Sequence, residues 1–237
     1  MRILITGARA ATPYGEGVAE RLGRELSRRG YTILTPYSYG IGVAVLRGVL
    51  SPGRIPMRGG RTPEWQRPVV YVPHGLLPGG VLYPPVRALG VDLRHCELVY
   101  TGVHPGMGRF LERGRRMVDE ADAVIVVESF LRSGAMTEVV RAESRGIPIL
   151  AVPGPVDSAA SVGTNLLLRD GRARVCQGAD DVETLVGGPW LGANTPDVDT
   201  PHVGEYPVTR GDVTQLSEMN TPTPGLVTLS TPHVVVA

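Results

Sequence analysis

The chain has 237 residues, with 24 basic and 23 acidic side chains and a formal net charge of +1 at pH 7. All 24 basic residues are arginine. This excludes P-loop ATPases, which need a lysine on the triphosphate, and enzymes that form a Schiff base through lysine. Arginine suits planar, bidentate contact with phosphate, so phosphate binding stays open.

Cysteine usage and hydropathy favour a cytoplasmic protein. The two cysteines, Cys96 and Cys176, are too few for a disulfide framework, and we expect both thiols to be reduced. No apolar run approaches the ~20 residues of a membrane span. The residues after Met1 are typical of a strand and not of a signal peptide. We therefore expect no membrane segment.

Charge is distributed unevenly along the chain. Residues 1–187 carry 23 arginines against 18 acidic residues, a balance of +5. Residues 188–237 carry one arginine against five acidic residues, a balance of −4. A mildly basic body with an acidic tail is compatible with nucleic-acid binding but does not require it.

Predicted strands and helices alternate from the amino terminus. Residues 2–6 form a continuous apolar strand, and residues 16–29 carry apolar side chains at helical spacing. A strand at 32–35 and a short apolar helix at 40–50 follow. The segment 51–68 is rich in proline, glycine and arginine, which predicts an exposed loop.

The alternation continues up to residue 187. Further strands are predicted at 69–72, 97–101, 123–128, 147–152 and 173–176. Helices are predicted at 106–119, from the Ser133-Gly134 loop onward, from Gly163 onward and at 180–186. This order predicts a Rossmann-like α/β domain over residues 1–187, with a doubly wound, mostly parallel sheet. Residues 188–237 show neither a helical nor a strand period, and we expect a disordered, acidic Thr/Pro/Gly-rich tail there.

Small and polar residues follow several of the predicted strands. In parallel sheets, ligands bind at the carboxyl ends of the strands. Small residues at that edge leave backbone N–H groups free at helix N-termini, which favours anions. The pattern therefore predicts a phosphate ligand.

The ordered set of these loops resembles one known family. The set comprises Gly7-Ala8-Arg9, Tyr14-Gly15, Phe110 with Arg113-Gly114-Arg115, Ser133-Gly134, Ala151-Val152-Pro153-Gly154 and Gly163-Thr164-Asn165. Its order and spacing over residues 1–185 are similar to those of the DNA-processing protein A family (DprA, also called Smf). The resemblance implies a Rossmann-like domain that binds single-stranded DNA and helps to load a RecA-type recombinase, notably in natural transformation. It also implies a homodimer.

Arginines and small residues at these loops are the predicted phosphate contacts. The candidate DNA-binding residues are Gly7, Arg9, Tyr14, Gly40, Arg109, Arg113, Arg115, Arg116, Ser133, Gly134, Gly154 and Asn165. Helical spacing places Arg109, Arg113 and Arg116 near one stripe, with Phe110 and Met117 nearer the core. Ser133 or Thr137 could instead simply cap a helix.

The sequence departs from the family pattern at three positions. The motif Phe-x-x-Arg-Asn-Arg has Gly114 in place of asparagine, although both of its arginines remain. In a second motif, Gly42 replaces an aspartate and Leu46 replaces a histidine. Nearby, Tyr37 and Tyr39 are equally compatible with base stacking and with ordinary packing.

No residue pattern predicts a catalytic centre, a metal site or a cofactor. None of the five histidines has partners at metal-ligand spacing, and no nucleophile elbow occurs. We therefore expect a non-enzymatic DNA-binding protein. The alternative is a nucleotide sensor or nucleotide-processing enzyme on the same scaffold, with Glu128 and Glu138 as the only nearby acids. A dinucleotide-dependent reductase is poorly supported because the Gly-x-Gly-x-x-Gly spacing is missing.

Overall fold

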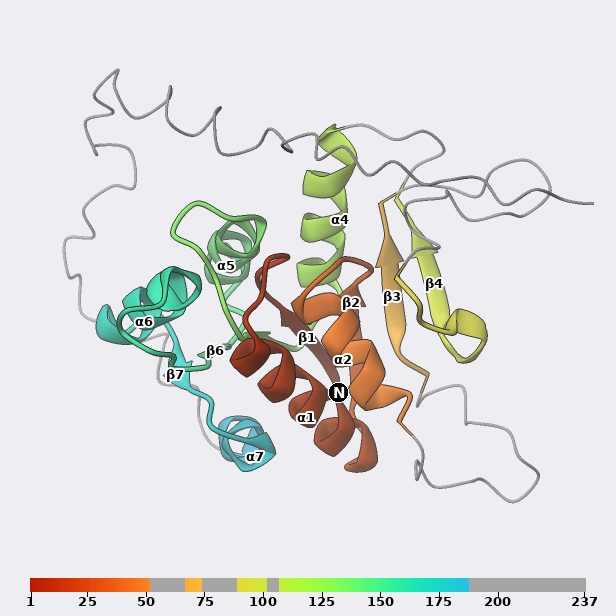
Figure 1. The fold of residues 1–237 in the computed structure, drawn as a ribbon, viewed down its shortest axis with the longest axis horizontal. Helices are drawn as coiled ribbons and strands as arrows, with labels where there is room; N and C mark the ends of the chain where they lie inside the picture. The colour runs from red at the N-terminus through yellow and green to blue at the C-terminus, as the bar shows by residue number, and fades with distance from the viewer. Residues whose placement is uncertain (52–66, 74–88, 102–106, 188–237) are drawn as a thin grey trace, which may run out of the picture. The chain divides into compact units, whose positions relative to one another are not determined.

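In the computed structural model, the described residues are 1–51, 67–73, 89–101 and 107–187. They contain a seven-stranded sheet in the order β4-β3-β2-β1-β5-β6-β7 (Figure 1). The strands are β1 Arg2–Thr6, β2 Thr32–Pro36, β3 Val69–Val72, β4 Glu97–Tyr100, β5 Ala123–Val126, β6 Ile149–Ala151 and β7 Arg174–Val175. Every pair of neighbouring strands in this sheet is parallel. The predicted Rossmann-like fold is confirmed.

Helices connect most of these strands. They are α1 Pro13–Arg28, α2 Ile41–Val49, α4 Met107–Asp119, α5 Gly134–Ser144, α6 Val162–Arg169 and α7 Ala179–Gly187, with short 3₁₀ turns at Leu93–His95 and Ala159–Ser161. α1 begins three residues before its predicted start. Thr12 caps it by accepting a hydrogen bond from the Gly15 N–H (3.2 Å), and Pro13 occupies the first helical position, where its missing N–H costs little.

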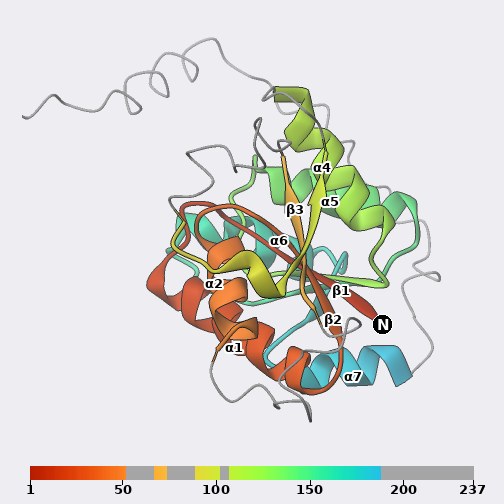
Figure 2. The same cartoon turned by 90° about the vertical axis from the view of Figure 1, so that its right-hand side faces the viewer.

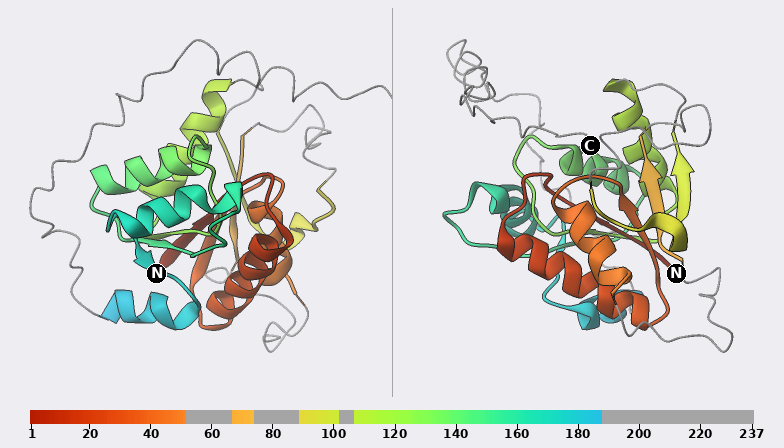
Figure 3. Two further views of the ribbon diagram at one scale, coloured as in Figure 1. Left: turned by 60° about the vertical axis from the view of Figure 1, so that its left-hand side comes forward. Right: turned by 45° about the vertical axis from the view of Figure 1, so that its right-hand side comes forward.

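Two apolar cores cover the two faces of the sheet. Alternate strand residues such as Ile3 and Ile125 pack under α1, α2 and α7. Their neighbours, such as Leu4 and Val124, pack under α4, α5 and α6. Figure 2 shows α1 and α2 on the opposite side of the sheet from α4 and α5, and Figure 3 shows the same layers from two further sides. Burial on both faces explains why the strands are continuous apolar runs.

The strand order reverses between β1 and β5. The chain builds β2, β3 and β4 on one side of β1, and then β5, β6 and β7 on the other. Thr6 is in register with Val126, so the loops that follow β1 and β5 leave the sheet side by side. Ligands of open α/β sheets bind at such a reversal, outside the carboxyl ends of the strands.

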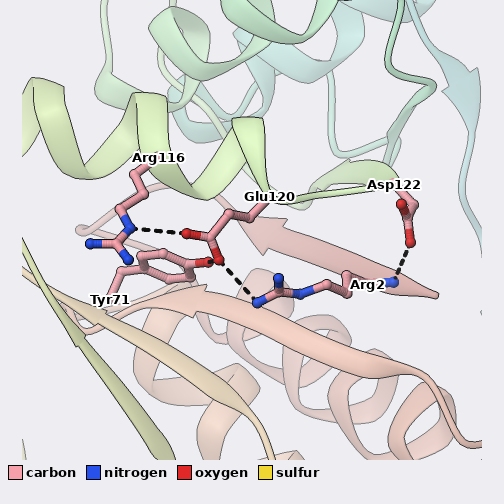
Figure 4. A network of polar contacts seen from close by, with 5 residues as sticks. All are labelled: Arg2, Tyr71, Arg116, Glu120 and Asp122. Carbon is pink, nitrogen blue, oxygen red and sulfur yellow. Dashed lines mark hydrogen bonds and ion pairs between the residues drawn. The ribbon is translucent and has the colours of Figure 1, made fainter. Parts of the chain in front are cut away.

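A polar network fixes the last turn of α4 against the sheet (Figure 4). Glu120 accepts hydrogen bonds from the Tyr71 hydroxyl at 2.7 Å, from Arg2 at 3.0 Å and from Arg116 at 2.9 Å. The Arg2 N–H donates to Asp122 at 2.7 Å. These contacts anchor one end of α4, and its first turns extend beyond the carboxyl ends of β1 and β2 (Figures 1 and 2).

Two sequence predictions fall outside the described residues. These are the tail at 188–237 and nearly all of the loop predicted at 51–68. Among the helices that the structure describes, none is long and apolar enough to cross a membrane.

Candidate nucleic-acid interface

The carboxylate of Glu128 occupies the N-terminus of α1. Glu128 follows β5, is only 1% exposed, and accepts hydrogen bonds from the Thr12 N–H at 2.8 Å and the Thr12 hydroxyl at 2.6 Å. Its backbone carbonyl accepts from the Ala8 N–H at 2.7 Å. Gly15 lies so close to this carboxylate that a Cβ there would overlap it. One buried residue thus joins the two loops at the strand reversal.

This arrangement fills the position that a dinucleotide phosphate takes in other Rossmann-like folds. A helix N-terminus attracts anions through its dipole and its unpaired N–H groups. In α1, the Thr12 and Gly15 N–H groups already have acceptors, and the anion present is an internal carboxylate. Gly7 packs against the Glu128 backbone, so it shapes the loop from within.

The N-terminus of α5 is arranged differently. Its N-cap residue, Ser133, makes no side-chain capping hydrogen bond, and the Ser133 hydroxyl instead lies 2.7 Å from that of Ser129. A Cβ added at Gly134 would meet no atom within 4 Å, so this turn faces open space. Arg132, which is exposed, immediately precedes it. The first N–H groups of an α-helix have no partner within the helix, so an anion can approach them here.

Two buried charged side chains lie beside each other between α4 and α5. Arg113 is 8% exposed and Glu138 is 7% exposed. In the part of the chain that the structure describes, the Arg113 Nε and Nη1 atoms and the Glu138 Oε2 atom have no hydrogen-bond partner. Buried polar atoms without partners are uncommon in native proteins and call for an explanation.

The pKa shifts of this pair follow from burial. Burial lowers the pKa of Arg113; the charge of Glu138 opposes this shift and the charge of Arg9 adds to it. Burial raises the pKa of Glu138, although a hydrogen bond with Thr6 and the charge of Arg113 act in the opposite direction. Arg9 itself is exposed and forms no ion pair with any described residue. Arg9, Arg113 and Glu138 therefore form one electrostatic group near the carboxyl end of β1.

Both phenylalanines of the chain lie at the surface of this region. Phe110, in the first turns of α4, is 40% exposed, and Phe130, in the loop before α5, is 36% exposed. The Arg113 guanidinium lies over the Phe110 ring, 5.4 Å from its centroid. The expectation that Phe110 lies nearer the core was wrong, because this part of α4 extends past the strands. Met117, two turns later, is buried as expected.

The predicted arginine stripe on α4 is divided. Arg113 faces the interior, whereas Arg116 is exposed and bonded to Glu120 on another face of the helix. Arg115 is exposed. Arg109 lies in the first turn of α4, and its side chain is outside the described part of the structure.

Four other candidate residues contact the loops themselves. The Tyr14 hydroxyl donates to the Pro153 carbonyl at 2.7 Å. The Asn165 side chain clamps the backbone of Gly154 through two hydrogen bonds, of 3.1 and 3.0 Å. Gly40 has a φ of +66° and lies against the carbonyls of the loop that carries Arg9.

Gly42 and Leu46, the two residues that differ from the second family motif, lie in the core. Gly42 packs against the backbone of Pro36, and Leu46 is buried together with Tyr37. Tyr37 therefore packs in the core, and only Tyr39 is exposed. Among the described residues, no group of three or more histidine, cysteine or acidic side chains could hold a metal ion.

A cleft of about 460 Å³ opens beside the N-terminus of α1, next to Tyr14, Arg21 and Pro153. Cys176 lines it. Burial raises the pKa of this thiol to about 12, with Asp181 contributing, so the thiol stays protonated near neutral pH.

Comparison with known proteins identifies the family. Residues 98–187 match the family model described as DNA recombination-mediator protein A. Over 189 residues, 77% of the chain, the sequence is 36% identical to a DNA processing protein DprA of Mycobacterium tuberculosis H37Rv. The chain belongs to the DNA-processing protein A family. It spans 44% of that mycobacterial relative's length.

Two solved structures of DNA processing protein A share the fold. The Helicobacter pylori protein, whose structure addresses its single-stranded DNA binding mode, matches with a TM-score of 0.63 and 23% identity, over 79% of this chain and 80% of that one. The Streptococcus pneumoniae protein matches with a TM-score of 0.63 and 24% identity, over 77% of this chain and 60% of that one.

Proposed function

We propose that this chain binds single-stranded DNA as a recombination mediator, with the phosphate backbone lying along the carboxyl edge of β1 and β5. The observation that carries the proposal is the open N-terminus of α5; Arg113, near Glu138 of the same helix, adds a buried positive charge. Arg9 and Arg132 extend the positive charge outward from this point. Successive phosphates would meet a helix N-terminus and several guanidinium groups.

Exposed aromatic rings support a single-stranded ligand over a duplex. Phe110 and Phe130 both belong to elements that border this edge. Unpaired bases stack on aromatic side chains with little sequence preference, whereas the bases of a duplex are already stacked on one another. The ssDNA binding mode studied in the Helicobacter pylori relative agrees with this choice.

The position of Glu128 favours a polynucleotide over a free nucleotide. The site at α1 that would hold a nucleotide phosphate already contains the Glu128 carboxylate. Both acids considered for nucleotide hydrolysis, Glu128 and Glu138, are buried in the protein interior. The proposed role is therefore non-catalytic: protection of single-stranded DNA and loading of a RecA-type recombinase, by a homodimer, as the family resemblance implies.

Fluorescence anisotropy with labelled oligo-dT, as single strand and as duplex, tests this proposal. Arg9→Ala and Arg132→Ala should each weaken single-strand binding and lower the salt slope by about 0.7, the contribution of one phosphate contact. Arg174→Ala is the matched control, because Arg174 is an exposed arginine on β7, the last strand of the sheet, which β6 separates from β5. Binding of AMP or ATP in place of oligo-dT would overturn the proposal in favour of a nucleotide sensor.

Recombinase loading needs its own assay. The full chain should speed assembly of a RecA-type recombinase on single-stranded DNA covered by a single-strand-binding protein. If the chain binds DNA but does not change recombinase assembly, the proposed DNA binding stands and the proposed mediator role is contradicted.

A further inference from the structure

Glu138 is the buried group that the proposed DNA-binding function leaves unexplained. Its carboxylate lies inside the predicted interface, near Arg113 and Thr6, and its Oε2 atom has no partner among the described residues. An ionised carboxylate beside a phosphate-binding arginine acts against the binding of phosphate. Burying it also costs free energy, unless it is paired and hydrogen-bonded.

The space for this carboxylate comes from Gly114. A Cβ at residue 114 would lie 3.3 Å from the Glu138 Cγ and Oε1 atoms, closer than side chains normally pack. The family motif has an asparagine at this position, which is larger still. Gly114 and Glu138 therefore pack against each other, and the missing side chain at residue 114 of α4 leaves room for the carboxylate from α5.

We propose that Glu138 is an internal counter-anion that competes with a DNA phosphate for Arg113, so that DNA binding by this chain is coupled to proton uptake at Glu138. The proposal rests on the proposed function. A phosphate that approaches Arg113 brings a second negative charge close to Glu138. Two like charges at one site disfavour ionisation of the weaker acid, so Glu138 binds a proton as the phosphate enters.

The groups packed around Glu138 leave it as the side chain that takes up the proton. The polar groups that face it are Thr6 from β1 and Arg113 from α4, with Arg9 acting on Arg113. The strands beneath α5, β5 and β6, contribute only apolar side chains. The other acid of α4 that contacts α5 is Asp119, and it is paired with Arg141 near the far end of the helix. Burial already raises the pKa of Glu138 and so favours its protonated form.

The test is the pH dependence of oligo-dT affinity for the full chain between pH 6 and 9 at constant salt. The wild-type affinity should fall as pH rises, with a limiting slope of about tenfold per pH unit for one linked proton. Glu138→Gln, which mimics the protonated acid, should bind more tightly at pH 8 and show a flat profile. Glu143→Gln is the matched control, because Glu143 lies on the same helix beside Arg172 and should keep the wild-type slope.

Proton uptake can also be measured on the wild-type protein alone. Calorimetric titration with oligo-dT in buffers of different ionisation enthalpy gives the number of protons bound, so the test does not depend on the folding of a variant. Tight binding with no proton uptake, or equal pH slopes for the wild type and Glu138→Gln, would overturn the role of Glu138 and leave the proposed function intact. Failure to bind oligo-dT at any pH would overturn both.

Discussion

The side chain of Glu128 holds Thr12 from across the strand reversal, although 116 residues separate them in the chain. Glu128 accepts from both the backbone N–H and the hydroxyl of Thr12, and Thr12 in turn caps α1 by accepting from Gly15. The start of α1 and the loop after β5 therefore depend on the same carboxylate. These hydrogen bonds hold the end of the loop that carries Arg9.

Glu128→Gln should destabilise the protein by about 1–3 kcal/mol, because an amide can replace only one of the two acceptor oxygens and leaves a buried donor poorly paired. Urea unfolding measures the change. Glu97→Gln, at an exposed glutamate, is the control and should stay within about 0.5 kcal/mol of the wild type. Equal stabilities of the two variants would show that the Thr12 contacts contribute nothing net.

Gly40 and Gly146 give a matched test of the packing behind Arg9. Both have positive φ, +66° and +63°, but an added Cβ meets the Ala8 and Arg9 carbonyls only at Gly40, and open space at Gly146. Gly146→Ala should cost about 1 kcal/mol from backbone strain alone. Gly40→Ala should cost clearly more and should also weaken oligo-dT binding, because the loop that carries Arg9 must move. Equal losses of stability and unchanged DNA binding would contradict the packing role.

Most of the fold follows from patterns local in the sequence. Continuous apolar runs such as 123–126 are buried on both faces, and this pattern distinguishes strands of a parallel sheet from surface strands. The start of α1 was placed three residues late, because its first turn is defined by Thr12 and Pro13 and not by the apolar period. A proline after a threonine is a capping signal that could have located it.

The site is less predictable because its geometry depends on contacts between distant segments. Helical spacing alone makes Arg113 and Arg116 similar, yet one is buried against α5 and the other is bonded to Glu120. Gly114 lies on the face of α4 that meets α5, and its small size permits the close approach of Glu138. No signal in the sequence alone pairs residues 114 and 138. The exposure of Phe110 depends on how far α4 extends past the sheet, which a periodic pattern does not report.

The Glu120 network predicts an acid-dependent loss of stability. Burial alone would raise the pKa of Glu120, but hydrogen bonds from Tyr71 and Arg116 and the charge of Arg2 outweigh it, so the pKa lies below its ordinary value of 4.5. The contribution of Glu120 to stability is therefore complete above about pH 4.5 and is lost as pH falls through the lowered pKa. Thermal unfolding of the wild type and Glu120→Gln between pH 7 and pH 3 measures it.

In that experiment the two proteins should differ most at pH 7 and converge toward pH 3. Tyr71→Phe removes a hydrogen bond to the carboxylate without changing charge, and should cost about 1–3 kcal/mol at pH 7. A stability gap between the wild type and Glu120→Gln that does not change with pH would contradict the role assigned to its carboxylate.

The exposed phenylalanines predict a contribution to DNA affinity that salt does not change. If bases stack on Phe110 and Phe130, Phe110→Ala and Phe130→Ala should each weaken oligo-dT binding by about 1–3 kcal/mol. Neither variant removes a positive charge, so the slope of log affinity against log salt should match that of the wild type, whereas Arg9→Ala should lower it. Val175→Ala, an exposed apolar truncation on β7, is the control and should leave both quantities unchanged. Loss of affinity together with a reduced slope in Phe110→Ala would mean that the ring acts by positioning Arg113, over which it lies, and does not stack on a base.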